Sequence, residues 1–301
     1  MKIAVLKELD RKHVEKIRSC GVRVVEGPDY DAEIVFTAGT LPDFSRYKKL
    51  KWIHTSFAGI DRLVTEELKK SKVIITNSRG VSSGLIAEHV FAFLLAFEHR
   101  LNRSMKSQAK RRWEKLDAYQ LDGNTIGILG LGNIGSEVAR LAKAFGCRVI
   151  AVTKESMSTG HVDELLPPEK MSSMLKRADY LVLCLPLTGD TKHLLSRKEF
   201  GLMKKSSILV NVGRGEVVDE EALVIALKKG KIRGACLDVF ETEPLPKSSP
   251  LWGMENVVIT AHYAGNSGSN DARTVDLFCG NLKAFLEGKA MKNIVNIQRG
   301  Y

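Results

Sequence analysis

The amino-acid sequence predicts an α/β protein built from two doubly wound parallel sheets. Three observations carry this prediction: strand-like apolar runs alternate with helical patterns, the alternation starts again at Thr125, and a glycine-rich turn follows that restart. Such alternation is typical of parallel strands covered by helices. The length of 301 residues suits two domains of about 150 residues each.

The first part of the chain contains the pattern of the first sheet. Its strand-like apolar runs are residues 2–6, 22–25, 32–36, 51–54 and 73–76. Helical patterns between these runs lie at residues 11–20 and 60–70. Because helices separate the strands, we expect the strands to run parallel.

The second sheet is expected from residue 125 onward. Its strand-like runs are residues 125–129, 148–152, 180–185, 207–211, 234–237 and 256–259. A long apolar helix is predicted at residues 85–101, between the two sheets, and a second long helix at 269–286, followed by the segment 293–297. These two helices are candidate connections between the domains.

The charge of the chain is strongly positive, with 46 Lys and Arg against 35 Asp and Glu, a formal net charge of +11. Clustered cations would indicate nucleic-acid binding. The lysines are spread along the chain, however, and the densest run, residues 100–115, resembles a solvated helix face. We therefore expect no nucleic-acid partner, and a positive field that attracts small anions.

Hydropathy and cysteine spacing limit the class of protein further. No apolar run reaches the length of about 18 residues that a membrane span needs, so we expect a cytoplasmic protein without a membrane partner. The five cysteines stand singly, without the paired spacing of a zinc site or a disulfide framework. The sequence thus predicts reduced thiols and no metal site.

The glycine-rich turn reads Gly130-Leu-Gly132-Asn133-Ile134-Gly135, between a strand-like run and a helical pattern. In a dinucleotide site the first glycine allows the tight turn, the second lets the backbone approach the pyrophosphate, and the third permits close packing of helix on strand. The amide groups at the helix start would face the phosphates. The flanking strand and helix favour a dinucleotide site over a purely structural turn.

The end of the next strand bears on the choice of cofactor. An acidic side chain there would bind the ribose hydroxyls of NAD and repel a 2′-phosphate. This chain instead has Thr153 and Lys154, a hydroxyl and an ammonium, followed by Glu155. The pair favours NADP, with NAD as the alternative if Glu155 turns inward.

Three side chains at the ends of later strand-like runs suit the reduction of a 2-keto acid: Arg214, Glu243 and His262. An arginine can bind a carboxylate through two parallel hydrogen bonds. A histidine can donate a proton to the oxygen that gains charge during hydride transfer, and a carboxylate beside it stabilises the protonated ring. Each residue taken alone could be structural; their joint occurrence favours catalysis.

The segments that carry these three side chains, the glycine turn and Ser56-Phe-Ala-Gly-Ile-Asp61 occur in the same order as in one protein family. The chain resembles the D-isomer-specific 2-hydroxyacid dehydrogenases. The resemblance implies a Rossmann cofactor domain, residues 96–271, inserted into a flavodoxin-like substrate domain, residues 1–95 plus 272–301. It also implies a homodimer formed through the cofactor domains by the segment 103–120, with Trp113 as an anchor.

The resemblance assigns further residues to the site. Amide groups of Ala58 and Gly59 would bind the substrate carboxylate, and Asp238 would hydrogen-bond the nicotinamide carboxamide. Leu185, Pro186 and Val212 would line the cofactor through backbone and apolar contacts.

Two positions depart from the family pattern. Ala261 stands where a proline usually precedes the histidine, and Ala264 where a glycine usually follows it, at an expected cofactor contact.

The function predicted in this way is reduction of a small 2-keto acid to a D-2-hydroxy acid. Two alternatives remain open. One is a nucleotide-sensing, corepressor-like binding protein of the same fold, since fold does not determine function. The other is a phosphoglycerate dehydrogenase.

Overall fold

The computed structural model describes residues 1–60, 62–154, 160–267 and 270–297. The chain forms two compact units, Met1–Ser82 with Asn266–Tyr301, and Ser83–Gly265. The domain boundaries expected at 95/96 and 271/272 lie inside helices α3 (Ser83–Glu98) and α9 (Asn270–Leu286). The division of the chain into domains at these two predicted boundaries remains a prediction.

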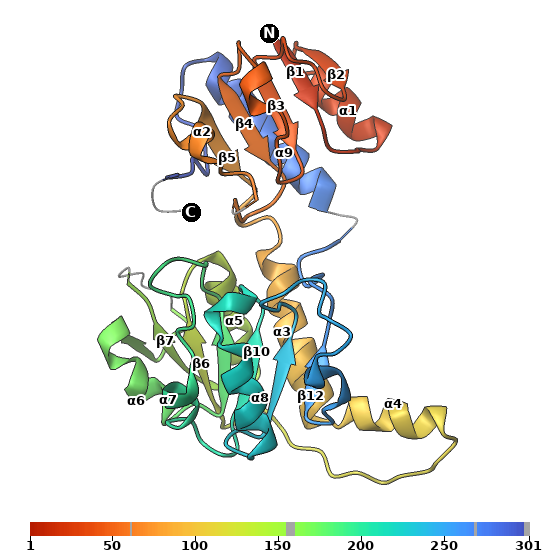
Figure 1. Ribbon diagram of the computed structural model, residues 1–301, viewed down its shortest axis with the longest axis vertical. Helices are drawn as coiled ribbons and strands as arrows, with labels where there is room; N and C mark the ends of the chain where they lie inside the picture. Colours follow the sequence, from red (N-terminus) through yellow and green to blue (C-terminus); the bar gives the residue numbers. More distant parts are fainter. Residues whose placement is uncertain (61, 155–159, 268–269, 298–301) are drawn as a thin grey trace. The chain divides into compact units, whose positions relative to one another are not determined.

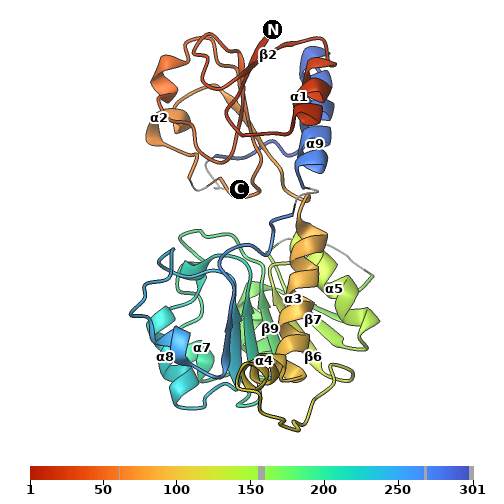
Figure 2. The ribbon, with the colours of Figure 1, turned by 90° about the vertical axis from the view of Figure 1, so that its right-hand side faces the viewer.

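The first unit contains a five-stranded parallel sheet of order β2-β1-β3-β4-β5. The strands are β1 (Lys2–Val5), β2 (Arg23–Glu26), β3 (Ile34–Thr37), β4 (Trp52–Thr55) and β5 (Ile74–Asn77). The helical segments are α1 (Arg11–Arg18), η1 (Phe44–Arg46), α2 (Glu66–Lys69) and α9. Helices α1 and α9 lie side by side in Figures 1 and 2 and are in contact. The prediction of a doubly wound parallel sheet is confirmed here.

The end of the chain completes this first unit. Phe278 of α9 is buried and stacks on Trp52 of β4, with ring centroids 5.0 Å apart. Beyond α9, Ile294 forms an isolated antiparallel bridge with Thr76, and Val295 is buried in the other hydrophobic cluster of this unit, with Ile53 and Ile75. Two segments separated by almost two hundred residues therefore pack together in both hydrophobic clusters of the first unit.

The second unit contains a seven-stranded parallel sheet of order β12-β11-β10-β9-β6-β7-β8. The strands are β6 (Thr125–Leu129), β7 (Arg148–Val152), β8 (Glu164–Leu166), β9 (Tyr180–Leu183), β10 (Ile208–Asn211), β11 (Gly234–Leu237) and β12 (Val257–Ile259). The order reverses at β6, which is the arrangement of a Rossmann sheet and confirms the predicted fold. Central strands such as β9 and β10 are buried at every position, as expected of a sheet covered on both faces.

Helices cover this sheet on both faces. The helices of this unit are α3, α4 (Leu101–Ala109), α5 (Asn133–Ala144), α6 (Met171–Leu175), α7 (Arg197–Phe200) and α8 (Glu220–Lys228), with short 3-10 turns η2 (Pro168–Lys170), η3 (Gly215–Val217) and η4 (Pro250–Gly253). Helix α3 packs against α5, as the turned view in Figure 2 illustrates.

Two predicted helices differ from the structure, and one strand was not predicted. The single helix expected at 85–101 ends at Glu98, because Arg100 adopts a left-handed conformation with φ of 57° and a separate helix, α4, begins after it. The helix expected at 60–70 is reduced to α2, whose start is set by the Thr65 side chain accepting from Leu68 N. Strand β8 was not predicted, because its three residues are too short to give a periodic signal.

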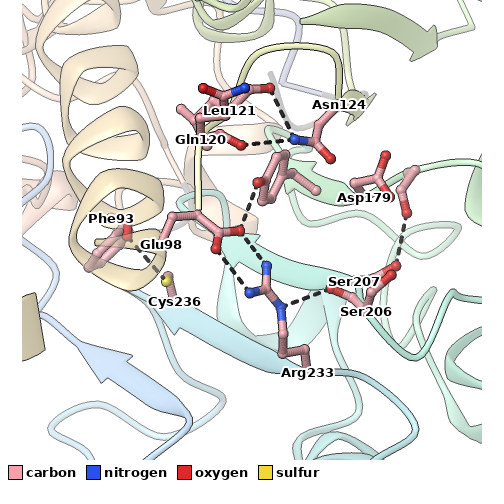
Figure 3. A network of polar contacts seen from close by, with 12 residues as sticks. Phe93, Glu98, Gln120, Leu121, Asn124, Asp179, Ser206, Ser207, Arg233 and Cys236 are labelled. Carbon is pink, nitrogen blue, oxygen red and sulfur yellow. Dashed lines mark hydrogen bonds and ion pairs between the residues drawn. The ribbon is translucent and has the colours of Figure 1, made fainter. Parts of the chain in front are cut away.

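A buried ion pair joins the end of α3 to the sheet (Figure 3). The Glu98 carboxylate is fully buried, accepts a 2.7 Å hydrogen bond from Tyr180 Oη and is bound by both terminal nitrogens of Arg233. The backbone carbonyl of Glu98 also accepts from Tyr119 N, at 3.1 Å. Burial, together with the Glu98 carboxylate, raises the pKa of Tyr180, which stays a neutral donor. The network fixes the segment after α4 to the core.

Within the described part of the chain, no helix is long and apolar enough to cross a membrane. All five cysteines are free thiols, and Cys147 and Cys236 are buried. Burial raises the pKa of the Cys147 thiol to about 11. These thiols have the character of core side chains rather than of nucleophiles.

Candidate active site

The expected site residues of the second unit gather at one edge of its sheet. All seven strands are parallel, so their carboxyl ends lie along the same edge. The expected residues follow those ends: Gly130 after β6, Thr153 after β7, Leu185 after β9, Arg214 after β10, Asp238 and Glu243 after β11, and His262 after β12. Ligands of open α/β sheets bind at this edge, where the strand order reverses.

The glycine turn between β6 and α5 has the geometry of a phosphate cradle. Gly130 has φ of 93°, and a Cβ added there would lie 2.8 Å from Cys184 O. A Cβ on Gly135 would overlap Gly130 O, so helix and turn are in direct contact at this glycine. A Cβ on Gly132 would meet nothing within 4 Å, so the backbone is open there. Gly132 caps α5, and the amides of Asn133 and Ile134 belong to its first turn, where no intrahelical acceptor exists.

These features fit a dinucleotide. The open face at Gly132 would receive the pyrophosphate, since a side chain there would fill the space that the phosphates need. Leu185 flanks the same turn, with its Cδ2 3.0 Å from the carbon that a side chain on Gly130 would add. Val212 is 7% exposed and belongs to the core beneath the edge, whereas Pro186 is exposed and its carbonyl accepts from Thr191 Oγ1 at 2.7 Å.

A carboxylate that the sequence interpretation missed lies beside Lys154. Lys154 Nζ is 2.7 Å from Asp190 Oδ2, and both side chains are exposed. The hydrogen bond from Lys154, with its charge, lowers the pKa of Asp190. Thr153 N donates to Leu166 O of β8 at 3.2 Å. Glu155, the other residue considered for cofactor choice, lies outside the described residues.

His262 and Glu243 form a hydrogen-bonded pair. His262 Nδ1 lies 2.7 Å from Glu243 Oε2, and the imidazole is 47% exposed. The second carboxylate oxygen of Glu243 accepts from Phe240 N at 3.2 Å, which fixes the carboxylate from behind. His262 Nε2 forms no hydrogen bond with a described residue, so it is the ring nitrogen that is available to a further partner.

Asp238 organises the loop that carries this histidine. Its carboxylate is buried and accepts from Thr260 Oγ1 at 2.5 Å, Tyr263 N at 3.0 Å and Ala264 N at 3.0 Å. Its backbone carbonyl accepts from His262 N at 2.8 Å. His262 itself has φ of 52°, a left-handed conformation that these bonds hold in place.

The methyl group of Ala264 lies in the hydrophobic core, where the residue is 3% exposed. At this position the methyl group packs inward, and the amide carries the polar contact.

Arg214 begins the 3-10 turn after β10. Asn211 holds this turn, because its Nδ2 donates to Arg214 O at 3.0 Å and its Oδ1 accepts from Gly213 N at 3.1 Å. Arg214 Nη1 donates to Gly213 O at 2.9 Å. A Cβ added to Gly215 would overlap the carbonyl group of Phe240, so the arginine turn directly contacts the segment that leads to Glu243.

Ala58 and Gly59 belong to the first unit, in the loop after β4. Phe57 and Ala58 are exposed. Asn77 Nδ2 donates to Ala58 O at 2.7 Å, and Ser78 N to Phe57 O at 3.0 Å. The sequence interpretation did not identify Asn77, because nothing in the local pattern distinguishes a strand-end asparagine that reaches another loop. Asp61 lies outside the described residues.

Comparison with known proteins matches this chain to one family. Residues 91–264 match the model of the NAD-binding domain of D-isomer-specific 2-hydroxyacid dehydrogenases. The chain belongs to this family. Its members are oxidoreductases, so the protein is an NAD(P)-dependent enzyme of the 2-hydroxyacid dehydrogenase class.

Individual D-2-hydroxyacid dehydrogenase relatives cover most of the chain. It is 34% identical over 293 residues to the glyoxylate reductase of Korarchaeum cryptofilum, covering 94% of this chain and 85% of that one. It is 34% identical to the D-3-phosphoglycerate dehydrogenase of Methanocaldococcus jannaschii, covering 94% of this chain and 53% of that one. A crystal structure of the NADPH-dependent glyoxylate/hydroxypyruvate reductase of Sinorhizobium meliloti with NADP and sulfate has a TM-score of 0.86, at 26% identity and with 100% and 99% of the two chains covered.

Proposed function

We propose that the protein reduces small 2-keto acids to D-2-hydroxy acids with NADPH. The observation that carries the proposal is the 2.7 Å pair of His262 Nδ1 and Glu243 Oε2, which lies at the same sheet edge as the glycine cradle after β6. A protein that only binds a dinucleotide needs the glycine cradle but not a hydrogen-bonded pair of histidine and glutamate. An exposed imidazole held by a carboxylate through one nitrogen, with no bond from its second nitrogen to a described residue, is the arrangement of a proton donor.

Each side chain has a defined task in this reaction. A bound nicotinamide supplies the hydride. His262 Nε2 donates the proton to the carbonyl oxygen as charge develops there, and Glu243 keeps the ring oriented and stabilises its protonated form. Arg214 binds the oxygens of the keto acid through its planar guanidinium.

The substrate carboxylate is bound by the amide groups of Ala58 and Gly59. Backbone N–H groups that point to one locus stabilise an anion without any change of protonation. Asp238 serves the reaction through the loop that it holds, since its carboxylate fixes Tyr263 and Ala264 next to the histidine. We also assign to it the nicotinamide carboxamide, for which its Oδ2, with a single described donor, retains accepting capacity.

NADP is the preferred cofactor and NAD the alternative. The hydroxyl of Thr153 and the ammonium of Lys154 follow β7, where a 2′-phosphate would lie, and the Sinorhizobium meliloti relative is NADPH-dependent. The Asp190 carboxylate beside Lys154 opposes this preference, because it would repel the phosphate. We expect Lys154 to exchange this carboxylate for the phosphate on binding.

We also propose a homodimer formed through the segment 103–120. Trp113 is 91% exposed and Met105 is 69% exposed, and Figure 1 illustrates how α4 and the following segment project from the sheet. Large apolar side chains at such exposure mark a protein contact. Light scattering of the wild type and of Trp113→Ala tests this assignment. Cytoplasmic location, supported by the free thiols, is tested by cell fractionation.

Glyoxylate and hydroxypyruvate are the first substrates to test, because the relatives named above act on them. D-3-Phosphoglycerate is the second candidate and rests on a relative of which this chain spans about half. Initial rates of NADPH and NADH oxidation are measured against glyoxylate, hydroxypyruvate, pyruvate, phenylpyruvate and 4-methyl-2-oxopentanoate. Tight nucleotide binding without turnover of any keto acid would instead favour the corepressor-like binding protein.

Two variants test the assigned roles. We expect His262→Ala to lower kcat by about 10²- to 10⁴-fold, the contribution of a general acid, while leaving the Kd of NADPH unchanged. Arg214→Ala should mainly raise KM for the keto acid. An equal loss of cofactor affinity in both variants would contradict these roles.

A further inference from the structure

The loop after β4 is held by its carbonyl groups. Ser78 N donates to Phe57 O at 3.0 Å, and Asn77 Nδ2 donates to Ala58 O at 2.7 Å. Asn77 and Ser78 are consecutive residues at the end of β5, the neighbouring strand. Two successive peptide groups of the loop are therefore anchored to one point on the sheet.

A hydrogen bond that holds a peptide carbonyl also fixes the direction of the N–H group in the same peptide. A trans peptide is planar, and its C=O and N–H point in opposite directions. The Phe57 carbonyl shares its peptide with the Ala58 N–H, and the Ala58 carbonyl shares its peptide with the Gly59 N–H. Bonds that draw both carbonyls toward β5 therefore turn both N–H groups away from it, and neither N–H donates to another described residue.

Asn77 is itself rigidly held. It is 3% exposed, and its Oδ1 accepts from Arg79 N at 3.2 Å. Its backbone N donates to Asn293 O at 3.2 Å, and its backbone O accepts from Asn293 Nδ2 at 3.2 Å. Both ends of the amide side chain and both backbone groups are thus engaged, so the side chain cannot turn away from Ala58 without breaking another bond.

Phe57, the residue before Ala58, is also held in place. The Phe57 ring lies against Gly39, where an added Cβ would come within 2.5 Å of the ring, at a φ of 91°. The N–H group of Phe57 is also engaged, because it donates a hydrogen bond to Thr55 Oγ1 at 3.3 Å. The peptide groups on both sides of Ala58 are therefore preorganised before any ligand arrives.

We propose that Asn77 is a positioning residue for substrate: through the Ala58 carbonyl it aims the Gly59 N–H, beside that of Ala58, at the substrate carboxylate. The inference rests on the proposed function, because it assumes that these amides bind a carboxylate. Preorganised donors bind an anion more tightly than mobile ones, because no ordering is required during binding. Loss of Asn77 should therefore weaken substrate binding rather than cofactor binding.

The chain offers a closely matched control. Asn281 is 2% exposed, its Nδ2 donates to Lys292 O at 2.9 Å, and its Oδ1 accepts from Lys292 N at 2.7 Å. It lies in the same unit, and like Asn77 it donates to a backbone carbonyl and accepts from a backbone N–H, but both of these groups belong to Lys292 and not to the loop. Asn281→Ala therefore reproduces the structural cost of losing a buried amide.

The experiment compares wild type, Asn77→Ala, Asn77→Asp and Asn281→Ala. Asn77→Asp keeps the shape and the acceptor for Arg79 N but removes the donor to Ala58 O. For each protein, kcat and KM are measured with glyoxylate and NADPH, and the Kd of oxalate and of NADPH by calorimetry. We expect both Asn77 variants to raise KM and the oxalate Kd about tenfold or more, as loss of a charge-assisted hydrogen bond does, with the Kd of NADPH unchanged.

The outcomes separate the two proposals. A purely structural role of Asn77 would lower thermal stability in Asn77→Ala and Asn281→Ala alike and leave KM and the oxalate Kd at wild-type values, which would overturn the inference while the proposed function stands. If Asn77→Ala does not fold, Asn77→Asp gives the same comparison. Wild-type protein that neither reduces glyoxylate nor binds oxalate would overturn the proposed function, and the inference with it.

Discussion

Substitution of Gly215 by alanine should separate the arginine turn from the segment that carries the glutamate. A Cβ at this position would overlap the carbonyl group of Phe240 and lie 2.5 Å from Glu241 N. Non-bonded heavy atoms need about 3.5 Å, so the two backbone segments must move apart by at least about 1 Å. Because the obstacle is backbone rather than a rotatable side chain, we expect a stability loss of about 3 kcal/mol, the upper end for overpacking.

The same displacement predicts a catalytic effect. A misplacement of about 1 Å in a catalytic group can reduce activity about 100-fold, so kcat/KM with glyoxylate should fall by that order in Gly215→Ala. The glycine cradle after β6 is not touched, and the Kd of NADPH should stay within about twofold of wild type.

Gly253→Ala is the matched control, because a Cβ at Gly253 meets nothing within 4 Å. Urea unfolding, steady-state kinetics and calorimetry are measured on both variants. If Gly215→Ala were as stable and as active as Gly253→Ala, the close contact between the two segments would be refuted.

Three further predictions follow from buried or charged groups. Glu98→Gln should destabilise the second unit by roughly 3 kcal/mol, measured by urea unfolding, because it leaves the Arg233 guanidinium without its buried counterion. Asp190→Asn should strengthen NADP binding about two- to fivefold and leave NAD binding unchanged in calorimetry, since Lys154 is then no longer neutralised by that carboxylate; equal changes for both cofactors would argue against a 2′-phosphate at this position. Burial lowers the pKa of His54 to about 3 from 6.5, so the unfolded chain binds more protons below pH 6.5 and stability is lost as the pH falls through this range. His54 should account for a loss of about 2 kcal/mol in the free energy of unfolding between pH 7.5 and pH 5. A His54→Asn variant that loses as much stability over this pH range as the wild type would contradict the prediction.

The strand pattern of the second unit could be predicted well. The strands at 125–129, 148–152 and 234–237 coincide with the predicted runs, because buried parallel strands are continuous apolar segments. The helix expected at 85–101 was wrong at its end, since no local pattern distinguishes the left-handed Arg100 from a helical residue. Strand β8 was missed because three residues at a sheet edge carry little periodicity.

The sequence by itself determined the order of the elements, the glycine cradle and the side chains that follow each strand, because these depend on residue type and spacing along the chain. Only the tertiary structure decided which of these side chains meet. The contacts of Lys154 with Asp190 and of Asn77 with Ala58 join segments at the ends of different strands. Such contacts depend on strand order and loop path, which hydrophobic periodicity does not encode. The engagement of Asp238 by three donors of the His262 loop is likewise a property of the folded edge, where β11 and β12 lie side by side.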